Sequence, residues 1–274
     1  MAEFASHDGL ILHYSDEGSG LPLLCLPGLT RTTADFDYVI PYLRDCRIIR
    51  MDYRGRGRSA WDSNWENYSL PVECRDVITL LNHLGLDRVA ILGTSRGGLN
   101  AMSLAMSHKD RLTGVALNDI GPELHPDGLA FIMGYLGRNP GGKSHVDAAR
   151  GLERAMTNFV DVPFARWMEE AVKHYRVTSS GLSITYDPRL RDAVEAQAAQ
   201  ETPDLWPLFD ALQGMPIACI RGENSDLLSQ KTLREMQRRR PDMIAATVVG
   251  RGHIPFLDEP EAVAALQTWI NELR

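Results

Sequence analysis

The chain has 274 residues, of which 44% are hydrophobic, and a formal net charge of −7. This length and composition fit a single α/β domain that carries an insertion and buries a sizeable core. The acidic balance argues against nucleic acid or an anionic membrane surface as a partner. No stretch approaches 18 apolar residues, and the N-terminus lacks a basic and apolar leader pattern, so we expect neither a membrane span nor a signal peptide.

The four cysteines are well separated in the sequence and form no C-x-x-C pair. Their spacing therefore argues against a zinc site or a thioredoxin-type redox site. We interpret Cys25, Cys46, Cys74 and Cys219 as buried, reduced thiols, which fit a cytoplasmic protein. No pattern calls for a metal ion or an organic cofactor, and the chain is expected to be a monomer or a homodimer.

The first part of the chain alternates predicted strands with predicted helices. Asp8-Gly9 marks a hairpin turn, and the apolar run 22–27 indicates a strand buried on both faces. The further elements that we predict in this part are a short helix over 34–43, a strand over 47–52, a helix over 70–84, a strand that ends near residue 94, a helix over 96–107 and a strand over 112–118. This alternation indicates a mostly parallel sheet, which we take to have eight strands, with helices on both faces.

The pattern changes over residues 119–213, where helical segments dominate. We predict helices over 129–136, 146–159, 163–174 and 190–199, and little strand beyond 182–186. Strand and helix then alternate again over 216–273. Residues 1–118 and 214–274 are therefore expected to form one core domain, interrupted by a helical insertion.

The most informative segment is Gly-Thr-Ser-Arg-Gly at 93–97, which follows an apolar, β-branched run and precedes a helical pattern. A G-x-S-x-G sequence between a strand and a helix is typical of a nucleophile elbow, a tight turn that exposes the serine Oγ. Gly93 and Gly97 are expected there because a side chain would collide with the neighbouring backbone. Ser95 is therefore the candidate nucleophile.

A serine nucleophile needs a histidine base and an orienting carboxylate. Two late loops, which follow predicted strands at one edge of the sheet, contain such residues: Asp226 in the first and His253 in the second. We predict His253 as the base and Asp226 as the carboxylate. Asp119, at the end of the 112–118 strand, and Glu223 remain alternative carboxylates, and Asp119 is otherwise expected to shape the pocket.

The oxyanion of the transition state requires backbone N–H donors. We expect one from Arg96, the residue after the nucleophile, and one from Leu29 in the loop after the predicted strand over 22–27. Gly28 would let this loop come close to a substrate oxygen. Gly28, Asp119 and Trp206 are the candidate substrate-binding residues, although Trp206 also fits ordinary packing within the helical insertion.

These motifs, in this order, resemble the α/β-hydrolase fold superfamily over nearly the whole chain. The segments that carry the resemblance are 26–29 (Leu-Pro-Gly-Leu), 52–59 (Asp-Tyr-Arg-Gly-Arg-Gly-Arg-Ser), 93–97, 221–226 (Arg-Gly-Glu-Asn-Ser-Asp) and 252–255 (Gly-His-Ile-Pro). The resemblance implies that residues 119–213 form a helical cap over the site. It also makes epoxide hydrolases and dehalogenases unfavoured, since those members have an aspartate where Ser95 stands.

The fold alone does not select the reaction. We expect a serine hydrolase that cleaves small to medium carboxylic esters, with lactones in the same range, through an acyl-enzyme. The alternative is a C–C bond hydrolase of aromatic-ring degradation that uses the same triad and needs a cationic pocket. A non-catalytic binding module is a third class, and the complete set of candidate residues argues against it; perhydrolase and amidase chemistry also stay open.

Overall fold

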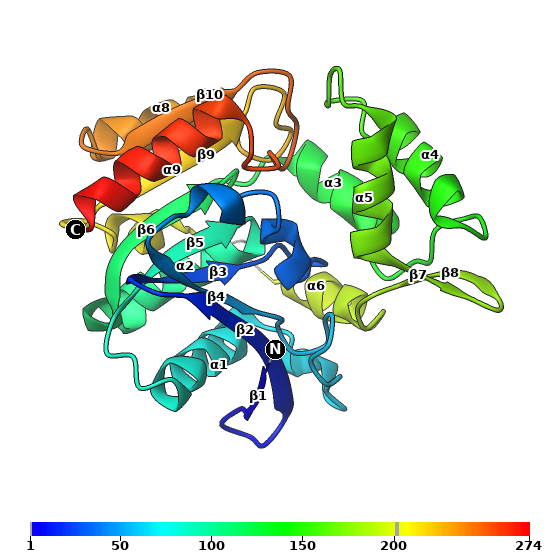
Figure 1. The fold of residues 1–274 in the computed structure, drawn as a ribbon, viewed down its shortest axis with the longest axis horizontal. Helices are drawn as coiled ribbons and strands as arrows, with labels where there is room; N and C mark the ends of the chain where they lie inside the picture. The colour runs from blue at the N-terminus through cyan, green and yellow to red at the C-terminus, as the bar shows by residue number, and fades with distance from the viewer. Residues whose placement is uncertain (1, 201–202) are drawn as a thin grey trace.

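The structure is a computed structural model that describes residues 2–200 and 203–274. An eight-stranded sheet runs through the molecule in the order β1-β2-β4-β3-β5-β6-β9-β10 (Figure 1). The contacts of β2 with β1 and β4 are antiparallel, and all other neighbours in the sheet are parallel. The strands are β1 (Ala2–Ala5), β2 (Ile11–Gly18), β3 (Leu21–Leu26), β4 (Cys46–Met51), β5 (Val89–Thr94), β6 (Leu112–Asn118), β9 (Ile217–Gly222) and β10 (Ile244–Val248). The predicted fold class is confirmed.

Helices pack on both faces of this sheet, as the alternating pattern predicts. The bounds outside residues 119–213 are η1 (Thr33–Phe36), η2 (Ile40–Tyr42), η3 (Trp65–Asn67), α1 (Leu70–His83), α2 (Arg96–Ser107), η4 (Lys109–Arg111), α8 (Gln230–Arg239) and α9 (Pro260–Glu272). One apolar layer contains side chains of α1, α2 and α8, and the other contains side chains of α9, η1 and η2. The short helix predicted over 34–43 is thus two 3₁₀ turns. Central strand β5 is buried along its whole length because both layers cover it.

All four cysteines are buried and unpaired, which confirms their interpretation as thiols. Burial raises the pKa of Cys74 to about 12, so this side chain is a weak nucleophile. In the described residues, no helix is both long enough and apolar enough to cross a membrane.

Residues 119–213, called here the inserted segment, connect β6 to β9. Its elements are α3 (Pro126–Tyr135), α4 (His145–Ala155), α5 (Phe164–His174), β7 (Tyr175–Thr178), β8 (Gly181–Ile184), α6 (Leu190–Ala198) and α7 (Trp206–Asp210). The helices agree closely with the predicted ones, but the single strand expected near 182–186 is a two-stranded hairpin, and α7 was not predicted. Glu201 and Thr202 lie outside the described residues. Helices α4 and α5 and the hairpin stand apart from the sheet, on the right in Figure 1.

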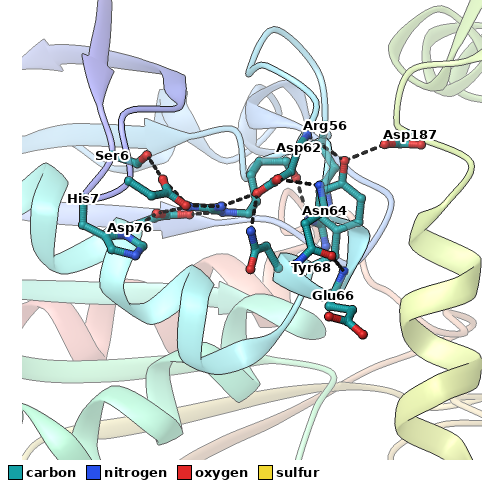
Figure 2. Close-up of polar contacts among 12 residues, drawn as sticks. Ser6, His7, Arg56, Asp62, Asn64, Glu66, Tyr68, Asp76 and Asp187 are labelled. Carbon is teal, nitrogen blue, oxygen red and sulfur yellow. Dashed lines mark hydrogen bonds and ion pairs between the residues drawn. The ribbon is translucent and has the colours of Figure 1, made fainter.

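Buried ion pairs hold the loop over 52–59 that follows β4. The guanidinium of Arg54 is fully buried and donates to the carboxylates of Asp8, Asp62 and Asp76 at 2.6–3.2 Å. Figure 2 labels Asp62 and Asp76 of this group and also Tyr68, whose hydroxyl donates to Asp187 of the inserted segment at 2.6 Å. The contact links the inserted segment to the sheet domain. The positive charge of Arg54, shared among three carboxylates, reduces the repulsion between them.

Candidate active site

The nucleophile elbow forms where β5 passes into α2. Ser95 has φ 49° and ψ −111°, a strained conformation outside both elements. A Cβ on Gly93 would lie 2.6 Å from the backbone of Gly97, and one on Gly97 would lie 2.0 Å from the carbonyl oxygen of Leu26. Both glycines are therefore required by close backbone approach, as the sequence indicated.

The structure brings Ser95, His253 and Asp119 into one hydrogen-bonded row. Nε2 of His253 lies 3.1 Å from Oγ of Ser95, and Nδ1 lies 2.7 Å from Oδ2 of Asp119. The Asp119 side chain is fully buried, whereas that of His253 is 14% exposed. With the Nδ1 proton directed at the carboxylate, Nε2 is an acceptor for the serine proton, which is the geometry that an activated serine needs.

The assignment of Asp226 as the carboxylate that orients His253 is wrong. Asp119 holds that place: its positive φ of 53° turns the chain at the end of β6, and its Oδ1 accepts from the N–H of Gly222 at 2.8 Å. Its Oδ2 also accepts from the hydroxyl of Ser225 at 2.5 Å. Strands β6 and β9 are neighbours, so a carboxylate after either one can reach the histidine, and the sequence alone could not separate the two.

Asp226 instead faces a different part of the site. Its Oδ2 accepts from the side-chain amide of Asn158 at 3.4 Å, and both residues line the cavity beside Ser95. The preceding hydroxyl, that of Ser225, occupies the position against Asp119 and is fixed by the N–H groups of Leu227 and Leu228. This turn directs Asp226 away from the imidazole. Glu223, the weaker alternative, accepts from the N–H of Gly250 at 2.9 Å and so joins the two late loops.

The two candidate oxyanion donors are the N–H groups of Arg96, the residue after Ser95, and of Leu29, which lines the same cavity as Ser95. Arg96 is the first residue of α2, so its N–H has no partner within the helix. The carbonyl of Gly28 accepts from the N–H of Arg31 at 3.1 Å, and because the peptide is planar and trans, the N–H of Leu29 points the opposite way. A Cβ on Gly28 would lie 3.8 Å from that of Ser95, so this loop passes close to the nucleophile.

A buried network that sequence reasoning missed connects these two donors. The carboxylate of Glu73 on α1 accepts from Nε of Arg96 at 2.8 Å and from Nη2 of Arg56 at 2.8 Å. Arg56 also donates to the carbonyl of Leu29 at 3.0 Å. Burial opposes the ionisation of Glu73, but the charges of Arg96 and Arg56 outweigh it and lower the pKa. The Arg96 side chain, next to Ser95 in the elbow, is thus held in place by Glu73.

Two adjoining cavities lie near the nucleophile, and Ser95 lines the smaller of them. The smaller, of about 170 Å³, is lined by Gly28, Leu29, Ser95 and His253, together with residues of α3 and the segment after α4. The larger, of about 890 Å³, is lined mainly by the inserted segment. Thr30, Arg31, Phe131, Tyr135, Ala155 and Met156 line both cavities, so the two share a wall.

Of the three candidate substrate-binding residues, the structure places only Gly28 at a cavity. Asp119 is buried behind His253 and therefore orients the imidazole rather than touching a substrate. The indole N–H of Trp206 donates to Glu123 at 3.1 Å, and the guanidinium of Arg239 lies 4.0 Å from its ring. Trp206 lines neither cavity, and its contacts agree with the packing interpretation of this residue.

A buried charged cluster joins helix α5 to the sheet domain beside the larger cavity. Arg31 donates to Oε2 of Glu170 at 3.1 Å and lies 2.6 Å from the ring nitrogen of His174. Burial opposes the ionisation of Glu170, but the hydrogen bond and charge of His174, with the charges of Arg31 and Lys173, lower the pKa. Burial raises the pKa of the nearby Asp35. The charge of Arg31 is thus balanced within the protein.

Comparison with known proteins places the chain in a family. The sequence profile of the alpha/beta hydrolase family matches residues 23–266. A 3-hydroxybutyrate-oligomer hydrolase of Cupriavidus necator is 34% identical over 261 residues, which cover 92% of this chain and 88% of that protein. A crystal structure of an alpha/beta hydrolase from Novosphingobium aromaticivorans is 36% identical, with a TM-score of 0.93, and the match covers 99% of this chain and 97% of that one.

A third relative catalyses a different reaction. The 2-(acetamidomethylene)succinate hydrolase of Mesorhizobium japonicum is 26% identical over 254 residues, which cover 92% of this chain and 88% of that protein. A hydrolase of the same name has a solved structure that matches with a TM-score of 0.82 at 22% identity, covering 98% of this chain and 99% of that one. Together with the sheet order, the elbow and the family profile, these matches show that the chain belongs to the alpha/beta hydrolase family.

Proposed function

We propose that this protein is a serine hydrolase that cleaves carboxylic esters through an acyl-enzyme. The observation that carries the proposal is the row from Ser95 Oγ to His253 Nε2 (3.1 Å) and from His253 Nδ1 to Asp119 Oδ2 (2.7 Å), beside a cavity. The 34% identity to a 3-hydroxybutyrate-oligomer hydrolase supports an ester as substrate. The inserted segment would act as a cap, since it supplies much of the wall of both cavities.

The acylation step follows from the geometry. Ser95 Oγ attacks the ester carbonyl carbon and transfers its proton to His253 Nε2, while Asp119 stabilises the imidazolium that forms. The carbonyl oxygen becomes an oxyanion between the N–H groups of Leu29 and Arg96. Each such donor contributes about 3–4 kcal/mol in the transition state. The C–O bond to the alcohol then breaks, and the leaving oxygen takes the proton from His253.

Deacylation uses the same residues, with water as the nucleophile and Ser95 as the leaving group. A water molecule gives its proton to His253 Nε2 and attacks the acyl carbon, and the bond to Ser95 Oγ breaks as the serine regains a proton. The products are the carboxylic acid and free enzyme. No step requires a metal ion or an organic cofactor.

The proposal is tested with p-nitrophenyl esters from acetate to long acyl chains. We expect turnover that Ser95→Ala abolishes, with rates that fall once the acyl chain exceeds the cavity of about 170 Å³ beside Ser95. A fluorophosphonate probe should label Ser95 in the wild type. Absence of both turnover and labelling would refute a serine esterase.

Hydrolysis of a C–C bond is the second candidate. It is favoured by the arginines that line the larger cavity, because an acidic diketone substrate needs a cationic pocket. The two reactions differ in their response to simple esters. A C–C bond hydrolase should turn over a vinylogous 1,5-diketone acid and show little p-nitrophenyl ester activity, whereas the ester hydrolase should show the opposite.

A further inference from the structure

We propose that the larger cavity binds a free carboxylate at one end of an elongated ester, so that the substrate is an oligoester of a hydroxy acid. The proposal rests on the ester hydrolase function given above and names its substrate class. The smaller cavity would hold the short portion of the substrate that reaches Ser95. The larger one would hold the remaining units and the terminal carboxylate.

The first argument is the charge of the lining. Arg31, Arg138, Arg150 and Arg154 all line the larger cavity, and Asp147 is the only acidic residue among the described residues that line it. The Asp147 carboxylate accepts from the N–H groups of Lys143 and Ser144 at 2.9 and 3.0 Å, at the beginning of α4. The negative charge of Asp147 is therefore stabilised by backbone N–H groups at this end of the helix. Because arginines outnumber acidic residues in the lining, the cavity is positively charged, in a chain whose net charge is −7.

The second argument is that three of these arginines form no close ion pair, although the charge of Arg150 adds to the Lys143 N–H in lowering the pKa of Asp147. Across residues 2–200 and 203–274, the side chains of Arg138, Arg150 and Arg154 form no ion pair within 4.0 Å, whereas Arg31 is held by Glu170. Arg150 and Arg154 are four residues apart on α4, where like charges destabilise a helix. A bound carboxylate would relieve this repulsion, and arginine is well suited to bind one through two parallel hydrogen bonds.

The third argument is the position and shape of the cavity. Its volume of about 890 Å³ is too large for a single short acyl group, and six of its lining residues also line the smaller cavity, which Ser95 lines. The lining also includes Tyr175, Ile184 and Tyr186, which suit an aliphatic chain with small branches. An oligoester has an ester group at every unit, so its scissile bond can reach Ser95 while its carboxylate stays among the arginines.

The test compares a 3-hydroxybutyrate trimer with a free carboxylate and the methyl ester of the same trimer, by release of the shorter acid. For the wild type we expect kcat/KM for the acid to exceed that for the methyl ester by about tenfold or more, because charge-assisted hydrogen bonds to a carboxylate are lost in the ester. Since Arg138, Arg150 and Arg154 are exposed, this preference should shrink as salt is added.

The matched variants are Arg150→Gln, Arg154→Gln and Arg234→Gln. Arg234 is also an exposed arginine without an ion-pair partner in the part of the chain that the structure describes, but it lies on α8 away from both cavities. We expect the acid-to-ester ratio to fall several-fold in the first two variants and to stay unchanged in Arg234→Gln. The ratio is independent of any general loss of activity, because the methyl ester serves as the internal reference.

Equal kcat/KM for acid and methyl ester in the wild type, or an equal effect of Arg150→Gln and Arg234→Gln, would overturn the carboxylate site. If p-nitrophenyl acetate is still hydrolysed in a Ser95-dependent way, the proposed function stands and only the substrate class fails. If no ester is hydrolysed at all, calorimetric titration of the trimer acid into Ser95→Ala and its Arg150→Gln double variant decides the site. Weaker binding in the double variant supports it, and equal or absent binding refutes it.

Discussion

The replacement of Asp119 by asparagine is the sharpest test of the site, because this residue was not the one that the sequence favoured. In the structure Asp119 accepts three hydrogen bonds: from the Gly222 N–H at Oδ1, and from the Ser225 hydroxyl and His253 Nδ1 at Oδ2. Asparagine has one oxygen and one NH₂ group in the same shape. Only one of the two ends can therefore still accept.

The N–H of Gly222 determines which position the amide oxygen of the asparagine takes. If the NH₂ group faced the Gly222 N–H, two buried donors would oppose each other at a distance of 2.8 Å, at a cost of about 1–3 kcal/mol. The oxygen therefore stays at Gly222, and the NH₂ group faces His253 Nδ1. The imidazole must then carry its proton on Nε2, where it can no longer accept the proton of Ser95. We expect kcat to fall about 10⁴-fold, as for the loss of the correct tautomer in a serine triad, which corresponds to about 5 kcal/mol.

The assay is kcat on p-nitrophenyl acetate for the wild type, Asp119→Asn and Asp226→Asn, with thermal unfolding to show that each variant is folded. Asp226→Asn is the matched control, since Asp226 contacts Asn158 and has no hydrogen bond to His253. We expect it to keep activity within about tenfold of the wild type. An active Asp119→Asn enzyme together with an inactive Asp226→Asn enzyme would refute the reasoning.

Three further predictions concern the reaction and the stability of the protein. Ser95→Ala and His253→Ala should each lower kcat by several orders of magnitude and leave the melting temperature close to that of the wild type; residual activity near the wild-type level in either would argue against the triad. Glu73→Gln leaves two buried guanidinium groups without their carboxylate, so we expect a loss of about 3–5 kcal/mol in the free energy of unfolding by urea titration, and a stability equal to the wild type would contradict the network. Because the pKa of Glu170 is lowered in the folded protein, its ionised form stabilises the fold above the ordinary glutamate pKa near 4.5, and this contribution is lost as the pH falls below that value. The melting temperature of Glu170→Gln should thus lie below that of the wild type by a constant amount between pH 7 and about pH 5, and the difference should shrink only as the pH falls from about 4.5 toward the lowered pKa of Glu170; a difference that does not shrink in strong acid would count against a charged Glu170.

The sequence by itself determined the features that depend on local pattern. Apolar runs alternating with helical spacing predicted the sheet and its covering helices, because burial on both faces of a parallel strand leaves a continuous apolar signal. The elbow at Ser95 could also be predicted, because the two glycines and the strand–helix transition that it requires lie within one short stretch of sequence. The position of His253 in a late, glycine-flanked loop was also a local signal, and the structure places it against Ser95.

Only the tertiary structure decided which carboxylate reaches His253 and which side chains line the cavities. Asp119 and Asp226 follow neighbouring parallel strands, so the choice between them depends on the left-handed turn at Asp119 and on the hydroxyl of Ser225, which no spacing reveals. The Glu73 network joins residues from three separate segments, and the path of the inserted segment brings the arginines of α4 beside the cavity. These contacts depend on how distant elements pack, and packing is a property of the whole chain rather than of any window within it.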